Sequence, residues 1–220
     1  HFEVMADGLM VFSPDDLFAH AHREFGPSLY DTHNDLSGVC YSSSKRPILN
    51  ARPSFYTFNY VNDTHLLDWV EEQGINYDVI TDDDLHREGA DLLSRYRVVM
   101  TMTHPEYTSK EMLDALAAYQ NSGGRHMYMG GNGFYWRIAF HPTRQGVVEL
   151  RRGITGLRSW EAEAGEDSLS FTGEPSGLWR SSGRAPQRLT GVGFSAQVFD
   201  RSASYRRLTD SFNPRAAFVM

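Results

Sequence analysis

A histidine and a glutamate two residues apart, His104 and Glu106, are the side chains in this sequence best placed to do chemistry. They follow residues 98–103, an apolar and β-branched run that is typical of a buried parallel strand. Pro105 cannot donate a ladder hydrogen bond, so regular pairing should stop there. If the chain stays extended across Pro105, the two side chains project to the same side. An imidazole and a carboxylate converging at a strand end would form half of a metal site; the structural alternative is a satisfied polar cluster.

A glycine-rich segment, residues 130–133, follows a second strand-like run at 125–129. It lacks both the G-x-G-x-x-G spacing of dinucleotide-binding turns and the lysine of a P-loop. We therefore expect its backbone and the Asn132 amide to approach a small ligand closely. If the two strands are adjacent, this turn lies beside the histidine and the glutamate.

The composition is that of an ordinary globular protein and excludes several functional classes. Of the 220 residues, 40% are hydrophobic and 22% are charged. The formal net charge of −7, with scattered basic residues, argues against a nucleic-acid-binding surface. We expect no membrane span, because no run approaches roughly 18 apolar residues, and no signal peptide. A single cysteine, Cys40, excludes an internal disulfide framework and fits a reducing, cytoplasmic compartment.

Helix and strand patterns alternate from residue 61, with short connections between them. The expected helices cover 62–74, 82–96 and 111–119, and the expected neighbouring strands cover 77–81, 98–103 and 125–129. Additional strands are expected at 38–42, 146–151 and 189–194. The alternation predicts an α/β fold, a mainly parallel sheet flanked by helices with an irregular β-rich extension. We expect this sheet to resemble that of the glutamine amidotransferases.

Three segments of the chain differ in pattern, and we expect all of them to belong to one larger domain. Residues 1–60 are loop-rich and carry Tyr30, residues 61–145 form the α/β core, and residues 146–220 form the extension. Within the core, the three aspartates at 82–84 precede a helix, and capping of its positive end explains them better than a metal site does.

Cys40 and the tyrosine-rich loop each have an explanation that involves no catalysis. Amidotransferase-like sheets carry a nucleophilic cysteine at a strand-to-helix elbow, but here that elbow holds His104 and Glu106. Cys40 lies in a loop, so thiol catalysis is not expected. The tyrosine-rich loop around Tyr30 and Tyr41 could equally serve plain aromatic packing.

A series of motifs occurs in a characteristic order along nearly the whole chain. They are Ser28-Leu29-Tyr30-Asp31, Gly38-Val39-Cys40-Tyr41-Ser42-Ser43, Arg46-Pro47, Tyr77-Asp78-Val79-Ile80-Thr81-Asp82, His104-Pro105-Glu106-Tyr107, Gly130-Gly131-Asn132-Gly133-Phe134-Tyr135-Trp136 and Gly173-Glu174-Pro175-Ser176-Gly177-Leu178-Trp179-Arg180. In this order they resemble the large (beta) subunit of N,N-dimethylformamidase. That subunit is several times longer, so the chain resembles its central and following part.

The resemblance implies an amidohydrolase that converts N,N-dimethylformamide to dimethylamine and formate at a mononuclear iron. The family's iron is held by a tyrosinate, a histidine and a glutamate. His104 and Glu106 match the last two, and Tyr30 best matches the tyrosine, with Tyr41 or water as alternatives. Phenolate and carboxylate oxygens suit Fe(III), although ligand type alone does not separate iron from another hard ion.

The same resemblance implies a pocket and partners. Asn132 matches the family's pocket asparagine and joins the metal-bound histidine and glutamate as a catalytic residue. We expect Phe134 and Tyr135 to supply aromatic walls for the small amide. The implied partners are the small subunit of the same enzyme and other copies of the large subunit. The competing hypothesis is a non-catalytic, amidotransferase-like module that binds a ligand or partner.

Overall fold

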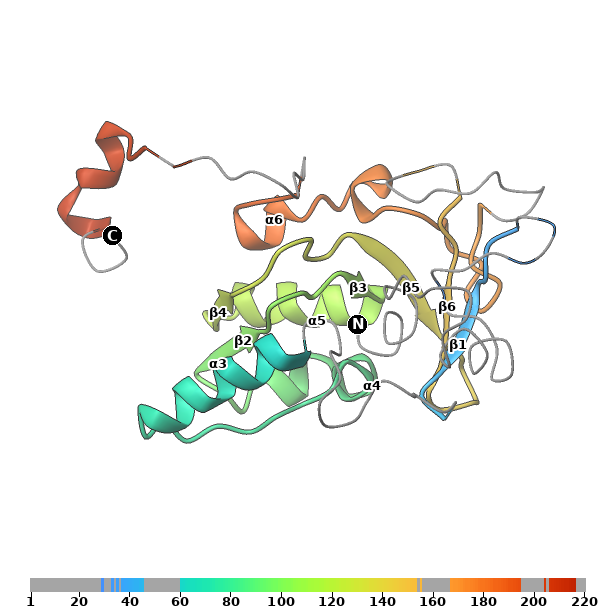
Figure 1. Cartoon of the computed structure of the whole chain (residues 1–220), viewed down its shortest axis with the longest axis horizontal. Coiled ribbons are helices and arrows are strands. Elements are labelled where there is room, and N and C mark those ends of the chain that lie inside the picture. The colour runs from blue at the N-terminus through green and yellow to red at the C-terminus, as the bar shows by residue number, and fades with distance from the viewer. Residues whose placement is uncertain are drawn as a thin grey trace, which may run out of the picture.

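The computed structural model describes residues 29, 33, 35, 37–45, 60–153, 155, 167–194, 204 and 206–216 (Figure 1). Its strands are β1 (Tyr41–Ser43), β2 (Val98–Thr101), β3 (Tyr107–Thr108), β4 (Arg125–Tyr128), β5 (Trp136–Phe140) and β6 (Val147–Leu150). Its α-helices are α3 (Tyr60–Glu72), α4 (Asp82–Leu93), α5 (Lys110–Asn121) and α6 (Gln187–Thr190). Its 3₁₀-helices are η1 (Trp179–Ser182), η2 (Thr209–Phe212) and η3 (Pro214–Ala216). No helix within these described ranges is long and apolar enough to cross a membrane.

The strands form two sheets, and the fold class is mixed α/β. The larger sheet has the order β1-β6-β5-β3, in which β6 is antiparallel to both of its neighbours and β3 is parallel to β5. The smaller sheet is the parallel pair of β2 and β4. The expectation of a mainly parallel sheet is therefore wrong for the described residues, although two of its three predicted strands do pair in parallel. All three predicted segments of the chain contribute a strand to the larger sheet.

Two predicted strands are wrong. Residues 77–81 form no strand; Val79 is 68% exposed, and the segment is held by side chains, since Asp78 accepts a hydrogen bond from Tyr96 at 3.0 Å. Its alternating pattern suits a strand, but none of the strands in the described part of the chain supplies ladder partners. The predicted strand at 189–194 is replaced by the end of helix α6 and the residues after it. The helix starts after Pro186 and stops at Gly191, whose φ is 77°. Proline before and glycine after are ordinary helix boundaries.

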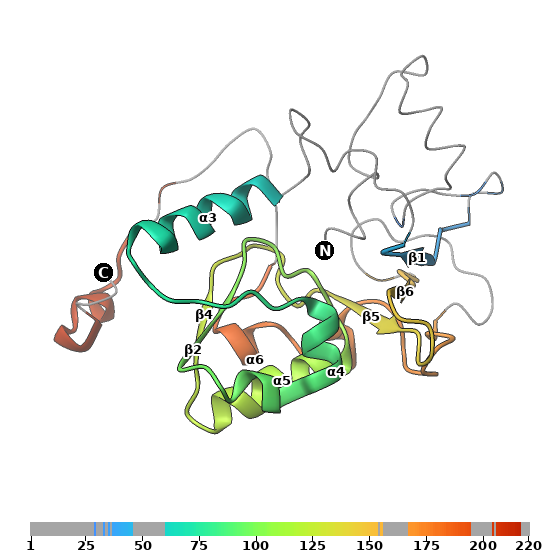
Figure 2. The ribbon, with the colours of Figure 1, turned by 90° about the horizontal axis from the view of Figure 1, so that it is seen from below.

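Helix α4 confirms that capping explains the acidic triplet. The hydroxyl of Thr81 accepts from Asp84 N at 3.1 Å, and the Asp84 carboxylate accepts from Thr81 N at 3.0 Å. Such reciprocal bonds satisfy two backbone donors at the helix start. A hydrogen bond from Thr81 Oγ1 to Asp84 Oδ2 at 2.7 Å, followed by the bond from Thr81 N, holds the pKa of Asp84 below its ordinary value. Helix α5 packs against α4, and Figure 2 shows the pair lying side by side, with α3 set apart from them.

Two hydrophobic clusters meet at the start of β5. Phe134 belongs to the cluster that α4 and α5 build around Leu93 and Leu116. The next two residues, Tyr135 and Trp136, belong to the cluster of the larger sheet. Consecutive side chains are thus buried in different clusters, which fixes the backbone at the segment where the sequence predicts a functional turn.

Candidate active site

The segment that carries His104 and Glu106 lies directly beside the glycine-rich turn. Beyond the β2–β4 ladder, Gly131 N donates to Thr103 O at 3.1 Å. Tyr135 N donates to Glu106 O at 3.0 Å, just before β3 and β5 pair in parallel. The predicted adjacency of the two segments is confirmed. It follows from parallel pairing, because parallel strands bring the loops after their carboxyl ends to the same edge.

His104 and Glu106 converge, although the chain between them is not extended. Glu106 N donates to His104 O at 2.8 Å, which closes a tight turn around Pro105. Regular pairing is interrupted here, as predicted, and resumes at Tyr107. His104 Nε2 lies 3.3 Å from Glu106 Oε2, and the two side chains are 17% and 8% exposed. The strand end therefore presents one imidazole and one carboxylate at a largely buried point.

The glycine at position 130 is required by the protein's own backbone. A Cβ atom there would lie 2.7 Å from both Thr103 O and Pro105 Cδ. Because no side chain fits, this glycine lets the turn pack directly against the His104 segment. The sequence predicts that this turn approaches a ligand closely. At Gly130 the close approach is instead to the neighbouring segment of the same polypeptide.

Asn132 sits at the centre of a rigid turn. Its φ of 51° is in the left-handed region, which asparagine tolerates better than most residues. The following residue is anchored because Gly133 N donates to Tyr128 Oη at 2.9 Å. Burial raises the pKa of Tyr128, so this hydroxyl accepts as a neutral phenol. Asn132 itself is half-buried, and none of the described residues bonds its side-chain amide in the structure.

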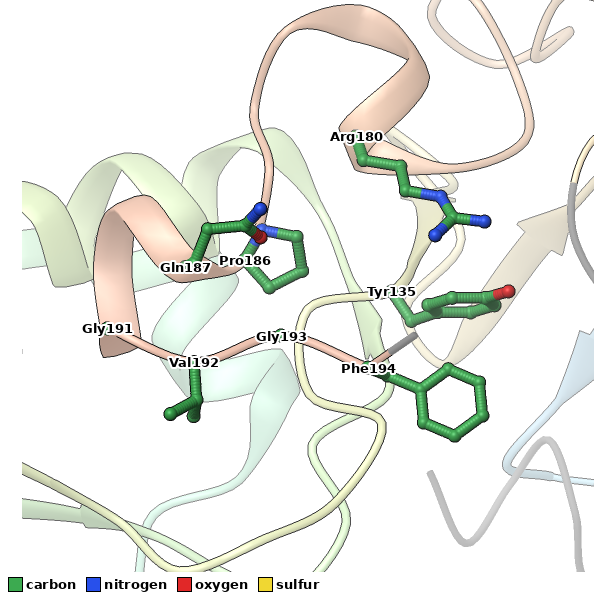
Figure 3. A pocket seen from close by; sticks show the side chains of 8 residues that line it. All are labelled: Tyr135, Arg180, Pro186, Gln187, Gly191, Val192, Gly193 and Phe194. Carbon is green, nitrogen blue, oxygen red and sulfur yellow. The ribbon is translucent and has the colours of Figure 1, made fainter. Parts of the chain in front are cut away.

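The two predicted aromatic wall residues have different surroundings. Phe134 is 1% exposed and packs in the core, with its ring centroid 5.9 Å from that of Tyr128. Tyr135 is also buried, but its side chain lines a cavity together with Arg180 and Phe194 (Figure 3). Phe134 thus fixes the turn, whereas the side chain of Tyr135 lines the cavity.

Tyr30 lies outside the described residues, but Leu29 before it is fully buried. Leu29 packs in the cluster that includes Tyr107, the residue after Glu106. Arg152, 1% exposed, donates from Nη2 to Leu29 O at 3.4 Å and to Tyr107 Oη at 3.5 Å. One buried guanidinium therefore connects the residue before Tyr30 with the residue after Glu106.

Tyr41, the alternative to Tyr30, has a hydroxyl that is used elsewhere. It accepts from Arg151 Nη2 at 2.7 Å and bonds to Ser170 Oγ at 2.8 Å. Strand β1, which carries Tyr41, is separated from β3 by β6 and β5. Neighbouring strands lie about 4.8 Å apart, so the two edges of this sheet are roughly 14 Å apart.

Asp63 is a site-supporting residue that the sequence pattern did not reveal. Its Oδ1 atom accepts from Thr103 N at 2.9 Å and from Thr103 Oγ1 at 2.7 Å. The sequence predicts a helix from residue 62, but α3 already starts at Tyr60, which places Asp63 within its first turn. Its partner lies 40 residues away, so no local signal points to the contact. Asp63 thus ties α3 to the residue before His104.

Removing the Asp63 carboxylate should disturb the site without unfolding the protein. If His104 and Glu106 hold a metal, as the resemblance implies, we expect Asp63→Ala to lower metal occupancy and the activity that depends on it by about tenfold or more. Asp63→Asn keeps an Oδ1 acceptor and should retain most of both. Asp68→Ala, on the exposed face of the same helix, is the matched control and should behave as wild type. Equal losses in the alanine and asparagine variants would contradict a positioning role.

The described residues supply two of the three predicted metal ligands. No third His, Cys, Asp or Glu joins His104 and Glu106 within the described part of the chain to form a metal-holding group. The pair itself fits a shared ion. Two donors bonded at about 2.0–2.2 Å and near a right angle lie about 3 Å apart, close to the 3.3 Å between Nε2 and Oε2.

The fold and this site define a mixed α/β protein with a buried imidazole–carboxylate pair beside a rigid asparagine turn. The chain belongs to the family described as N,N-dimethylformamidase beta subunit-like, C-terminal, which it matches over residues 10–219.

Two relatives carry the name N,N-dimethylformamidase beta subunit. The one from Paracoccus aminophilus is 39% identical to this chain over 224 aligned residues, and the one from Alcaligenes sp is 38% identical over the same length. Each alignment covers 99% of this chain and 29% of the relative. The chain therefore spans less than a third of the length of these relatives.

Proposed function

We propose that this protein is the metal-binding part of an amidohydrolase that converts N,N-dimethylformamide to dimethylamine and formate. The observation that carries the proposal is the buried His104–Glu106 pair beside Asn132, in a chain that belongs to the dimethylformamidase beta-subunit family. In this reaction water adds to the amide carbonyl carbon and the C–N bond breaks. Water supplies the new oxygen of formate and the proton that leaves with dimethylamine.

The proposed cofactor is a mononuclear Fe(III) held by Tyr30, His104 and Glu106. A phenolate and a carboxylate are hard anionic donors, and the imidazole adds a borderline nitrogen, so the donor set suits a trivalent iron. The burial of Leu29 against the Glu106 side of the site supports Tyr30 as the third ligand. When bound, the iron would polarise the amide carbonyl as a Lewis acid and acidify a bound water.

Asn132 is the proposed hydrogen-bond donor to the amide oxygen. Negative charge develops on that oxygen as water adds, and a preorganised donor stabilises it without reorganising. The N–H groups of Gly131 and Gly133 already donate to Thr103 and Tyr128. The side-chain NH₂ of Asn132 is therefore the better-placed donor of this turn. Its left-handed backbone and anchored neighbours hold it in place before substrate arrives.

We extend the proposal to the architecture and the setting of the enzyme. The parallel β2–β4 pair, connected through α5, supports a glutamine-amidotransferase-like core that further strands of the whole subunit would complete. The relatives' designation as a beta subunit supports the small subunit and further large subunits as partners. The single cysteine supports a reducing cytoplasm.

The test is elemental analysis and an amide-hydrolysis assay on the full-length subunit assembled with its small partner. We expect stoichiometric iron, a visible charge-transfer band from tyrosinate bound to Fe(III), and release of dimethylamine and formate. A colourless, iron-free and inactive assembly would contradict the proposal and favour a ligand-binding module. A different hard metal with full activity would overturn only the identity of the ion.

A further inference from the structure

A cavity of about 230 Å³ lies on the side of Tyr135 that faces helix α6. Figure 3 shows the side chains that line it: Tyr135, Arg180, Pro186, Gln187, Gly191, Val192, Gly193 and Phe194. The fold builds this cavity from three separate segments: the residue before β5, the 3₁₀-helix η1, and α6 with the residues that flank it on both sides.

The aromatic wall of the cavity is rigid. The Tyr135 ring is met edge-on by Trp136 at 5.3 Å and by Phe194 at 5.5 Å between ring centroids. Figure 3 shows the Arg180 side chain on the opposite side of the Tyr135 ring from Phe194. The guanidinium carbon of Arg180 lies 5.7 Å from the Tyr135 ring centroid, a cation–π distance. A buried ring held from several sides needs no rearrangement to receive a ligand.

Arg180, unlike its neighbour Arg184, has no acidic partner among the residues that the structure describes. The nearby Arg184 pairs with Asp114 at 2.8 Å. Within the described residues, no carboxylate lies within ion-pair distance of Arg180. Its guanidinium reaches solvent next to the cavity, in a protein whose formal net charge is −7. Because Arg180 is the one basic residue among those that line the cavity, the site favours a monoanion over a polyanion.

We propose that this cavity binds a small monocarboxylate, with its charged group on Arg180 and its apolar body against Tyr135 and Phe194. A guanidinium matches a carboxylate through two parallel N–H donors. The aromatic rings cover the hydrocarbon part, and the Gln187 amide adds a neutral hydrogen-bonding group. The proposed site is distinct from the metal ligands but linked to them, because Tyr135 N donates to Glu106 O.

The test is a calorimetric and ¹H–¹⁵N NMR titration of the metal-free protein with sodium butyrate, using butyramide as the neutral control. We expect saturable binding with a dissociation constant on the order of 1 mM and shifts at residues 135, 180 and 191–194. Butyramide should bind at least about tenfold more weakly, because it cannot make the charge-assisted pair. No saturable binding, or equal binding of the amide, would overturn the proposal.

Three variants locate the site. Arg180→Gln should weaken butyrate binding at least about tenfold, whereas Arg188→Gln, which removes another exposed arginine outside the cavity, should change it less than about twofold. His104→Ala should leave binding intact, which separates this site from the metal centre. Loss in His104→Ala without loss in Arg180→Gln would place the carboxylate at the metal ligands and overturn the proposal.

Formate tests the part that the apolar wall plays. It carries the charge without the hydrocarbon body, so we expect it to bind several times more weakly than butyrate. If formate binds as tightly, the aromatic wall contributes nothing and the proposed ligand class is wrong. These measurements need neither iron nor catalysis, so their failure is distinguishable from failure of the proposed function.

Discussion

Tyr30→Phe is expected to leave the protein folded while both iron content and amide hydrolysis collapse. The change removes one hydroxyl and keeps the aromatic ring, so packing is largely preserved. The variant removes the proposed third metal ligand, so the effect should exceed the roughly 10–100-fold losses typical of outer-shell partners. The measurements are iron per subunit, the visible charge-transfer band, the rate of dimethylamine release, and circular dichroism as the check on folding.

Tyr41→Phe is the matched control for this experiment. The Tyr41 hydroxyl bonds to Arg151 and Ser170 on the opposite edge of the sheet from β3. Its loss should cost local stability, on the order of 1 kcal/mol for lost hydrogen bonds, and leave iron and its band in place. If Tyr41→Phe loses the iron and Tyr30→Phe keeps it, the assignment of the third ligand is wrong and Tyr41 takes that role.

Asn132→Gly is expected to reduce kcat by about 10²–10³-fold with little change in KM, as for loss of one oxyanion donor. Glycine adopts the left-handed φ of 51° without strain, so the turn should keep its shape. The donor acts mainly on charge that develops in the transition state, and therefore kcat falls more than substrate binding does. Iron content and its visible band should be unchanged.

A second substitution at the same position separates hydrogen-bond donation from backbone shape. Asn132→Asp keeps the size of the side chain and the tolerance for a left-handed backbone, but replaces the NH₂ donor with a carboxylate oxygen. We expect it to be at least as inactive as the glycine variant. An active glycine variant beside an inactive aspartate variant would mean that the added charge alone is harmful, and the donor role would be refuted.

Local features of the chain were predictable because their partners lie close in sequence. The cap of α4 joins Thr81 to Asp84, three residues on, and Pro105 interrupts pairing through its own missing N–H. The convergence of His104 and Glu106 also depends on short spacing. Their i, i+2 separation brings the side chains together, even though the backbone makes a tight turn instead of an extended strand.

The parallel pairing of residues 98–101 with 125–128 was also predictable, because a helix between two strands favours a parallel connection. From that pairing followed the placement of the glycine-rich turn beside the histidine and the glutamate. The sequence by itself therefore determined the two-residue pair, its neighbouring turn, the main helices and, through the order of its motifs, the family.

Only the tertiary structure decided which segments found partners. Residues 77–81 have a strand-like pattern, but no strand among the described residues pairs with them, so they remain outside both sheets. Strand β5 is buried nearly throughout and shows no alternation to mark it, yet it joins β3 to β6 in the larger sheet. Strand pairing depends on hydrogen bonds to distant residues, which the periodicity of one segment does not specify.

The support of the site was likewise a tertiary outcome. Asp63 reaches Thr103 across 40 residues, and Arg152 reaches Leu29 across 123. Such contacts arise where packing brings two segments together, and a single aspartate or arginine carries no sign of them in its local sequence. The candidate catalytic residues could thus be predicted from their type and spacing, whereas the residues that hold them in place could be identified only in the folded structure.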